Sequence, residues 1–167
     1  MKISGRSLKR RVQLLGNRLS RIKHHNGHGV HSPFVYGFVR KVLMAKSLQE
    51  GTGSALFEAL RGVGLSEKRA RELHNAMCYA EAQNFAVNSV DADFVVYTRE
   101  QSIEALRSGY AETKSKGAIF VVSHPYDSRE RQVAIREMID NHRSTTIDNR
   151  AYTIFFNNRL PKQHYRL

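Results

Sequence analysis

The chain has 167 residues, enough for one domain with a substantial core and too few for two ordinary domains plus an N-terminal arm. A single cysteine, Cys78, excludes an internal disulfide framework and a zinc site built from several cysteines. No apolar run approaches the roughly 20 residues that cross a bilayer, and the N-terminus lacks the continuous apolar block of a secretory signal. We therefore expect a soluble, cytoplasmic protein in which Cys78 is an ordinary part-buried thiol.

Positive charge is concentrated at the N-terminal end of the chain. Residues 1–49 contain 11 lysines and arginines and no acidic residue, whereas residues 50–167 contain 16 basic and 15 acidic residues. The formal net charge of +12 is thus +11 in the first segment and +1 in the rest. We interpret residues 1–49 as a basic helical arm that meets an anionic partner, and residues 50–167 as an α/β domain.

Residues 7–23 carry apolar side chains at alternating spacings of four and three, which predicts an amphipathic helix. Its apolar seam consists of Leu8, Val12, Leu15, Leu19 and Ile22. Clustered basic side chains neutralise phosphates, so RNA or the ribosome is one candidate partner. The side chains that would make this contact are Lys9, Arg10, Arg11, Arg18, Arg21 and Lys23.

Three other interpretations of this helix stay open. The seam can dock on the body of the protein and leave the basic face in solvent. The helix can lie in the plane of a membrane, although its seam has no Trp or Phe anchor. Its composition also fits a cleaved transit peptide.

The next segment, HHNGHGVH at 24–31, holds four histidines in eight residues. Its glycines indicate a loop, and no cysteine or carboxylate joins the histidines, so we expect no specific metal site. Ser32 and Pro33 are typical of a helix cap and of a first helical position. The predicted helix runs to about Leu48 and ties the arm to the body through Phe34, Val35, Phe38, Val39, Val42 and Leu43.

The middle of the chain is predicted to be largely helical. We interpret residues 50–54, EGTGS, as a helix C-cap and loop, because the preceding KVLMAKSLQ is typical of a helix end. A short helix over 55–60 follows, and Ser66 caps a second helix that extends to about Gln83. His74 and Asn75 lie near the buried stripe of that helix, where we expect a hydrogen-bonded, partly buried pair.

Three strand-like segments come next. Residues 84–89 and 93–98 are joined by a link short enough for a hairpin. The alternative is that residues 84–89 form only the stub of a strand. A helix from Thr98 to about Lys114 leads to GAIFVVS at 117–123. This last run is apolar on both pleat faces, which predicts a central strand of a parallel sheet. The segments from 93 to 123 then form a right-handed βαβ unit.

Polar residues follow that strand, at the edge of the sheet where open α/β folds bind ligands. They are Ser123, His124, Tyr126 and Asp127. His124 oriented by Asp127 is a candidate catalytic base. The alternative is a loop histidine whose neighbouring aspartate caps the next helix.

The C-terminal part predicts one helix, a hairpin and an edge segment. In the helix, 127–142, we expect Val133, Ile135, Met138 and Ile139 to face the sheet, and Arg129, Arg131 and Arg136 to lie on a solvated face balanced by acidic residues. Residues 144–157 predict an antiparallel hairpin around Asn149-Arg150. The basic tail 160–167 is expected to pack along the sheet edge.

Two stretches carry a resemblance to a known family. GHGVHSPFVYGFVRKVL near the N-terminus, and GAIFVVS followed later by STTIDNRAYTIFFNNRLPKQHYRL, resemble a bacterial group of class I S-adenosylmethionine (SAM)-dependent methyltransferase-like proteins. The resemblance covers about the first 45 and the last 75 residues. It implies a shortened Rossmann-like, three-layer α/β domain of about five strands whose last pair is antiparallel. The 84–89 stub would then stand where that family has its third strand.

The chain departs from this family where the cofactor would bind. Such enzymes place a glycine-rich turn after a buried strand, and the only candidates here, Gly51, Gly53 and Ser54, follow a predicted helix. The two strand ends carry Thr98-Arg99-Glu100 and Ser123-His124-Pro125 where the family has acidic residues. Without paired carboxylates, a metal-assisted transfer is not expected.

Two functions of different class follow from the sequence. The first is a non-catalytic methyltransferase-like binding protein that needs no cofactor and whose basic arm contacts RNA or the ribosome. The second is an active SAM-dependent methyltransferase with an atypical pocket formed by residues 51–54 and the strand ends.

Overall fold

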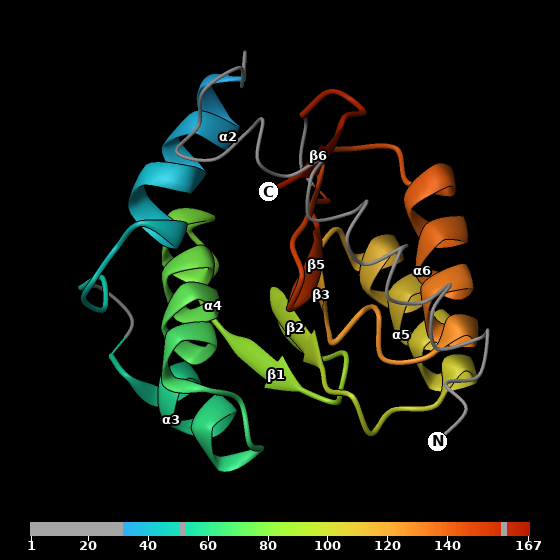
Figure 1. The fold of residues 1–167 in the computed structure, drawn as a ribbon, viewed down its shortest axis with the longest axis horizontal. Coiled ribbons are helices and arrows are strands. Elements are labelled where there is room, and N and C mark those ends of the chain that lie inside the picture. Colours follow the sequence, from blue (N-terminus) through green and yellow to red (C-terminus); the bar gives the residue numbers. More distant parts are fainter. Residues whose placement is uncertain (1–31, 51–52, 158–159) are drawn as a thin grey trace, which may run out of the picture.

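The computed structural model describes residues 32–50, 53–157 and 160–167, and it is an α/β fold of three layers (Figure 1). The middle layer is a mixed six-stranded sheet in the order β1-β2-β3-β5-β4-β6. Its strands are β1 (Phe85–Val87), β2 (Phe94–Tyr97), β3 (Ile119–Ser123), β4 (Thr146–Asp148), β5 (Tyr152–Phe155) and β6 (His164–Arg166). The predicted helix 7–23 and the histidine-rich loop 24–31 lie outside the described residues.

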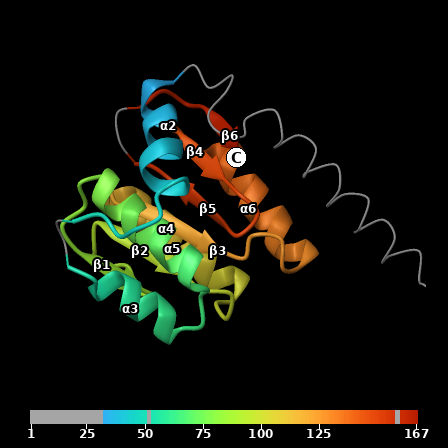
Figure 2. The same ribbon diagram turned by 60° about the vertical axis from the view of Figure 1, so that its left-hand side comes forward.

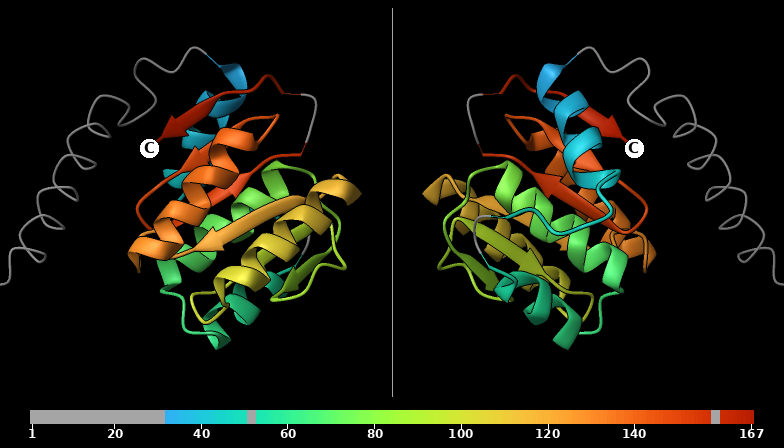
Figure 3. Two further views of the ribbon diagram at one scale, coloured as in Figure 1. Left: turned by 90° about the vertical axis from the view of Figure 1, so that its right-hand side faces the viewer. Right: turned by 90° about the vertical axis from the view of Figure 1, so that its left-hand side faces the viewer.

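Helices cover both faces of the sheet (Figure 3). One layer holds α2 (Pro33–Phe38), the π-helical segment η2 (Val39–Leu43), α3 (Ala55–Gly62) and α4 (Glu67–Tyr79). The other layer holds α5 (Ile103–Lys116) and α6 (Arg129–Asn141). In Figure 2, α2 lies over the end of the sheet that carries β4 and β6, and α3 lies toward β1.

The strand β3 shows why two hydrophobic cores form. All five of its residues are buried, as predicted. Ile119 and Val121 belong to the core under α2, α3 and α4, whereas Phe120 and Val122 belong to the core under α5 and α6. Because successive side chains of a strand point to opposite faces, an unbroken apolar run serves both layers at once.

The sheet is parallel on one side of β3 and antiparallel on the other. Strand β3 pairs in parallel with β2 and antiparallel with β5, so it is central but not flanked by two parallel neighbours. The predicted hairpin is confirmed, with Thr146 opposite Phe155 and Asp148 opposite Thr153. The predicted edge position of the tail is also confirmed, because β6 pairs in parallel with β4 and becomes a sixth strand.

The hairpin expected between residues 84–89 and 93–98 is wrong, because β1 and β2 pair in parallel. Strand β1 has only three residues, so the link 88–93 needs to return by only about 10 Å, and no long crossover is required. Asn88, at φ +60°, makes the reversal, and its main-chain N–H donates to the Val96 carbonyl at 2.9 Å. The result is a half-buried stub at the sheet edge, as in the alternative prediction.

The first described helix starts as predicted and ends early. The Ser32 hydroxyl accepts from the Val35 N–H, and Pro33 is the first helical residue. The helical chain stops at Leu43 and not near Leu48, because α4 binds the following backbone. Asn75 accepts from the Gln49 N–H at 2.9 Å and donates to the Ser47 carbonyl at 3.0 Å.

Other helix boundaries shift for similar reasons. Helix α5 starts at Ile103 and not at Thr98, because the Ser102 hydroxyl caps it by accepting from the Ala105 N–H at 3.1 Å. Helix α4 ends at Tyr79, four residues before the predicted end. In α6, Val133 is 48 % exposed, so its expected place against the sheet is wrong.

Replacing Gly109 with alanine should destabilise the fold. Gly109 lies in α5 where the helix meets β2, and a Cβ atom there would lie 2.5 Å from both Cζ and Oη of the buried Tyr97. We expect Gly109→Ala to lower the free energy of unfolding by about 1–3 kcal/mol in urea titrations, because the ring has to move in a packed core. Gly62→Ala is the matched control, because nothing lies within 4 Å of its added Cβ and alanine favours the helix. Equal stability of the two variants would contradict this packing.

Candidate functional site

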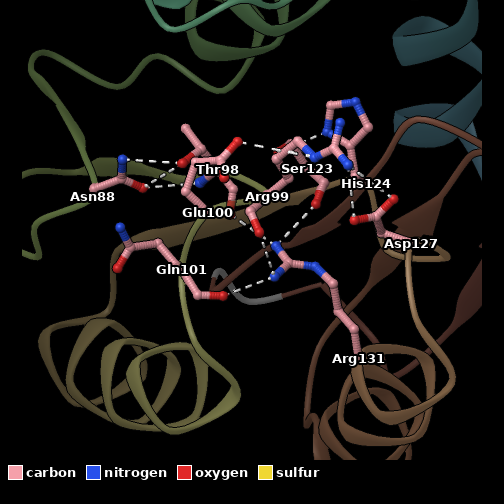
Figure 4. Close-up of polar contacts among 9 residues, drawn as sticks. All are labelled: Asn88, Thr98, Arg99, Glu100, Gln101, Ser123, His124, Asp127 and Arg131. Atoms are coloured by element: carbon pink, nitrogen blue, oxygen red, sulfur yellow. Dashed lines mark hydrogen bonds and ion pairs between the residues drawn. The ribbon is translucent and has the colours of Figure 1, made fainter.

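Polar residues gather at the carboxyl ends of β2 and β3, which meet at one edge of the sheet because the two strands are parallel (Figure 4). Thr98, Arg99 and Glu100 follow β2, and Ser123 and His124 lie at the end of β3. We call these five residues, together with Asn88, Gln101, Asp127 and Arg131, the strand-end cluster. The prediction that Ser123 and His124 lie at the carboxyl end of a buried strand is confirmed.

Arg131 was expected on a solvated face, and this prediction is wrong. It is 4 % exposed, and its guanidinium lies between the two strand ends. Its Nη2 donates to the carbonyls of Thr98 at 2.9 Å and Ser123 at 3.0 Å. Its Nη1 donates to the carbonyls of Gln101 at 3.0 Å and Arg99 at 3.4 Å. One side chain of α6 therefore joins β2, the turn after it, and β3.

The helical spacing of α6 explains this position. Residues 131, 134, 135 and 138 share its buried face. Extending the apolar stripe of Ile135 and Met138 back by one turn would have identified Arg131 as buried. Burial lowers the pKa of Arg131 from its usual value, and the Asp127 charge opposes that shift.

The end of β2 is also held from the side of β1. The Asn88 side chain accepts from the Thr98 N–H at 2.9 Å, and its Nδ2 donates to the Thr98 hydroxyl at 3.1 Å. Thr98 is itself buried. Main-chain groups that a ligand could otherwise bind are therefore engaged by Asn88 and Arg131.

His124 follows β3 in an unusual conformation. Its φ of +50° is rare for a residue with a side chain, and its N–H donates to the Ala151 carbonyl at 2.7 Å. Its ring Nδ1 lies 3.2 Å from the Ser123 hydroxyl. Burial, followed by the charge of Arg99, lowers the pKa of His124, so the ring is neutral at pH 7.

Asp127 pairs with Arg99, whose Nη2 lies 3.3 Å from Oδ2. The helix cap expected of Asp127 is supplied by the next residue, since the Ser128 hydroxyl accepts from the Arg131 N–H at 3.0 Å. Catalysis by His124 and Asp127 stays a prediction.

The candidate cofactor residues do not fit the expected turn. Gly51 lies outside the described residues. Gly53, at φ +66°, and Ser54 lie in the connection from η2 to α3 and do not follow a strand. The predicted loop is confirmed for Glu50, Gly53 and Ser54, but it is not a helix C-cap, because the preceding helix ends at Leu43. The SAM site expected from the resemblance requires a glycine turn between a buried strand and a helix, and Gly53 and Ser54 do not form such a turn.

Two cavities adjoin the C-terminal strands. One, of about 220 Å³, opens between the start of α4, the end of β3 and the start of β5, and it includes Ser123 and His124. The other, of about 150 Å³, lies between α6, β4 and β6. The described residues contain no group of three or more His, Cys, Asp or Glu side chains that could hold a metal ion.

Comparisons with protein-family models, curated proteins and solved structures found no match to this chain. The resemblance to methyltransferase-like proteins therefore stays a prediction. Among the described residues, no helix has the length and apolar character needed to span a membrane. The basic side chains Lys9, Arg10, Arg11, Arg18, Arg21 and Lys23 lie outside the described residues.

Removing the Arg131 guanidinium should destabilise the whole fold. Arg131→Met keeps the apolar stem but removes the charged donor from the buried carbonyl oxygens of Thr98 and Ser123, so we expect a loss of about 2–4 kcal/mol in urea titrations. Arg131→Lys should fall between Arg131→Met and the wild-type chain, because an ammonium lacks the planar geometry that reaches several carbonyls. The control Arg129→Ala, on the exposed face of the same helix, should change stability by less than about 0.5 kcal/mol. Similar losses for positions 129 and 131 would contradict the assigned role.

Proposed function

We propose that this chain is a non-catalytic binding protein, related to class I methyltransferase-like proteins, whose basic N-terminal segment contacts RNA. The observation that carries the proposal is the separation of charge. The segment 1–49 contains 11 basic residues and no acidic residue, whereas residues 50–167 contain 16 basic and 15 acidic residues. An RNA backbone is the anionic surface that such a segment would neutralise.

Several lysines and arginines of the described body form ion pairs with its own carboxylates. Arg107 pairs with Glu137 at 2.5 Å, and Lys116 lies 3.0 Å from Asp91 and 2.8 Å from Glu112. These pairs leave the body a weaker attraction for polyanions than its count of basic residues suggests. The excess charge therefore belongs to the N-terminal segment.

Two observations support a non-catalytic body. Arg131 and Asn88 engage the main chain at the edge where open α/β sheets bind ligands. Gly53 and Ser54 precede a helix without following a strand. A mixed sheet covered on both faces and finished by an antiparallel hairpin is compatible with a shortened Rossmann-like domain. The alternative, a SAM-dependent methyltransferase, would need a pocket that avoids these occupied groups.

RNA binding should depend on the N-terminal segment and on salt. A variant with Arg10, Arg11, Arg18 and Arg21 replaced by alanine is compared with the wild-type chain by fluorescence anisotropy of a labelled single-stranded RNA. Wild-type affinity should fall steeply between about 50 and 200 mM salt. The slope of log K against log salt should decrease by about 0.7 for each phosphate that the variant no longer neutralises.

The matched control replaces Arg129, Arg136, Arg143 and Arg150, four exposed arginines of the body, and changes the net charge equally. Its affinity should stay close to that of the wild-type chain. Equal losses in both variants would contradict a specific role of the N-terminal segment. RNA binding that does not weaken with added salt would also contradict the proposal, because neutralising phosphates releases counterions and is therefore salt-dependent.

A further inference from the structure

A buried histidine, His142, lies where three parts of the fold meet. It directly follows α6, it is 1 % exposed, and its N–H donates to the Ile139 carbonyl at 3.2 Å. Its ring packs against the rings of Tyr110 in α5 and Phe155 in β5, with centroids 5.9 and 5.4 Å away. One imidazole therefore joins α5, the end of α6 and the end of β5.

Both ring nitrogens of His142 have a hydrogen-bond partner. Nε2 lies 3.1 Å from the Phe156 carbonyl, and Nδ1 lies 2.9 Å from the Tyr110 hydroxyl. A carbonyl oxygen only accepts hydrogen bonds, so Nε2 carries the proton of a neutral ring and Nδ1 is the acceptor. The Tyr110 hydroxyl then donates to Nδ1. A neutral ring thus makes both bonds in a single tautomer.

A protonated ring would be poorly accommodated at this position. Nδ1 would become a donor, so the Tyr110 hydroxyl would have to turn and donate to the Met138 carbonyl at 3.4 Å. The charges of the described residues that act on the ring are the ammonium groups of Lys114 and Lys162, which repel another cation. Burial lowers the pKa of His142, the hydrogen bond to Phe156 opposes that shift, and the two lysines add to it.

The two lysines lie beside His142 because the end of α6 binds both of them. Lys114 Nζ donates to the Asn141 carbonyl at 3.3 Å, and Lys162 Nζ donates to the Asp140 carbonyl at 2.6 Å. The last carbonyls of a helix carry a partial negative charge, so cations are favourable there. The side chain of Asp140 is exposed and lines the cavity beside β6. The end of α6 therefore brings two cations to the histidine that it buries.

We propose that His142 is a proton-sensitive link, in which the neutral ring joins α5 and the end of α6 to the end of β5, and protonation separates them. The groups that it joins lie within residues 110–162, so the link is independent of the N-terminal segment and of RNA binding. In the separated form the histidine is exposed and takes up a proton near pH 6.5. The link therefore stabilises the fold fully above about pH 6.5, and this contribution is lost as the pH falls toward the lower pKa of the buried ring.

Amide hydrogen exchange of the full-length protein at pH 7, 6 and 5, corrected for the intrinsic effect of pH on exchange, tests the link. The reporters are the amides of His142 and Phe156, which donate to the carbonyls of Ile139 and Thr145. Their protection factors should fall about tenfold from pH 7 to pH 5, because the separated form gains a proton. The amides of β2, a strand paired on both sides, should keep their protection.

His142→Gln is the test variant, because its amide group can still donate to the Phe156 carbonyl but does not titrate. Protection at Phe156 should be lower than in the wild-type chain at pH 7 and should not change from pH 7 to pH 5. His164→Gln is the matched control, because His164 lies on β6 and its Nδ1 is 2.7 Å from the Thr146 hydroxyl. This control should keep the wild-type pH dependence at Phe156.

An NMR titration of the His142 ring in the wild-type chain gives a readout that needs no variant. The ring should take up a proton only together with the loss of protection at Phe156. The proposal is overturned if the ring titrates near pH 6.5 while Phe156 stays protected. It is also overturned if His142→Gln keeps the wild-type pH dependence, or if protection in β2 falls as much as at Phe156.

Discussion

The hydrogen bonds from Arg131 to the ends of β2 and β3 are the interaction on which the rest of this structure depends. The guanidinium donates to main-chain carbonyls of Thr98, Arg99, Gln101 and Ser123, so α6 is fixed to both strands through one side chain. A cation in the first turn of a helix is normally unfavourable because of the helix dipole. Here the strand-end carbonyls and the nearby Asp127 charge offset that cost, which explains how a charged residue is accommodated at 4 % exposure.

This interaction divides the edge of the sheet at the ends of β2 and β3 into two parts. On the side of α6, Arg131 occupies the space between the strand ends. On the side of α4, the same strand end contributes Ser123 and His124 to a cavity that also includes Arg69 and Tyr152. His124 lies at the boundary, and its φ of +50° turns the chain from β3 toward the start of α6. The edge is therefore filled by Arg131 on one face and bordered by this cavity on the other.

The sequence predicted those parts of the fold that depend on local pattern. Buried strands, helix starts after Ser32 and Ser66, and the β4–β5 hairpin follow from apolar runs and turn residues, and they are found near their expected positions. The parallel pairing of β1 with β2 was missed because it depends on the shortness of β1, a tertiary property. The early end of the first helix was missed because Asn75, 26 residues away from Gln49, binds the released backbone.

The candidate site shows the same limit. The polar residues at the end of β3 were predicted correctly from the sequence. Arg131 was wrongly predicted to be exposed, because arginines and acidic residues are interspersed along α6 as on a solvent-exposed helix face. The partner of Asp127 was also missed, since Arg99 follows a different strand and pairs with it only in the folded sheet. The cavity beside α4 is lined by residues from 64–69 and from 151–152, which are far apart in the chain. No pattern within either segment of the sequence indicates that the two lie side by side.

Because protein groups occupy the strand-end edge, we expect no place there for a methyl-donor cofactor. Titration of S-adenosylmethionine and S-adenosylhomocysteine into the full-length protein, followed by isothermal calorimetry, tests this claim most directly. We expect no heat beyond dilution for either compound. Saturable binding at micromolar concentration would contradict the claim and would identify the chain as a cofactor-binding protein.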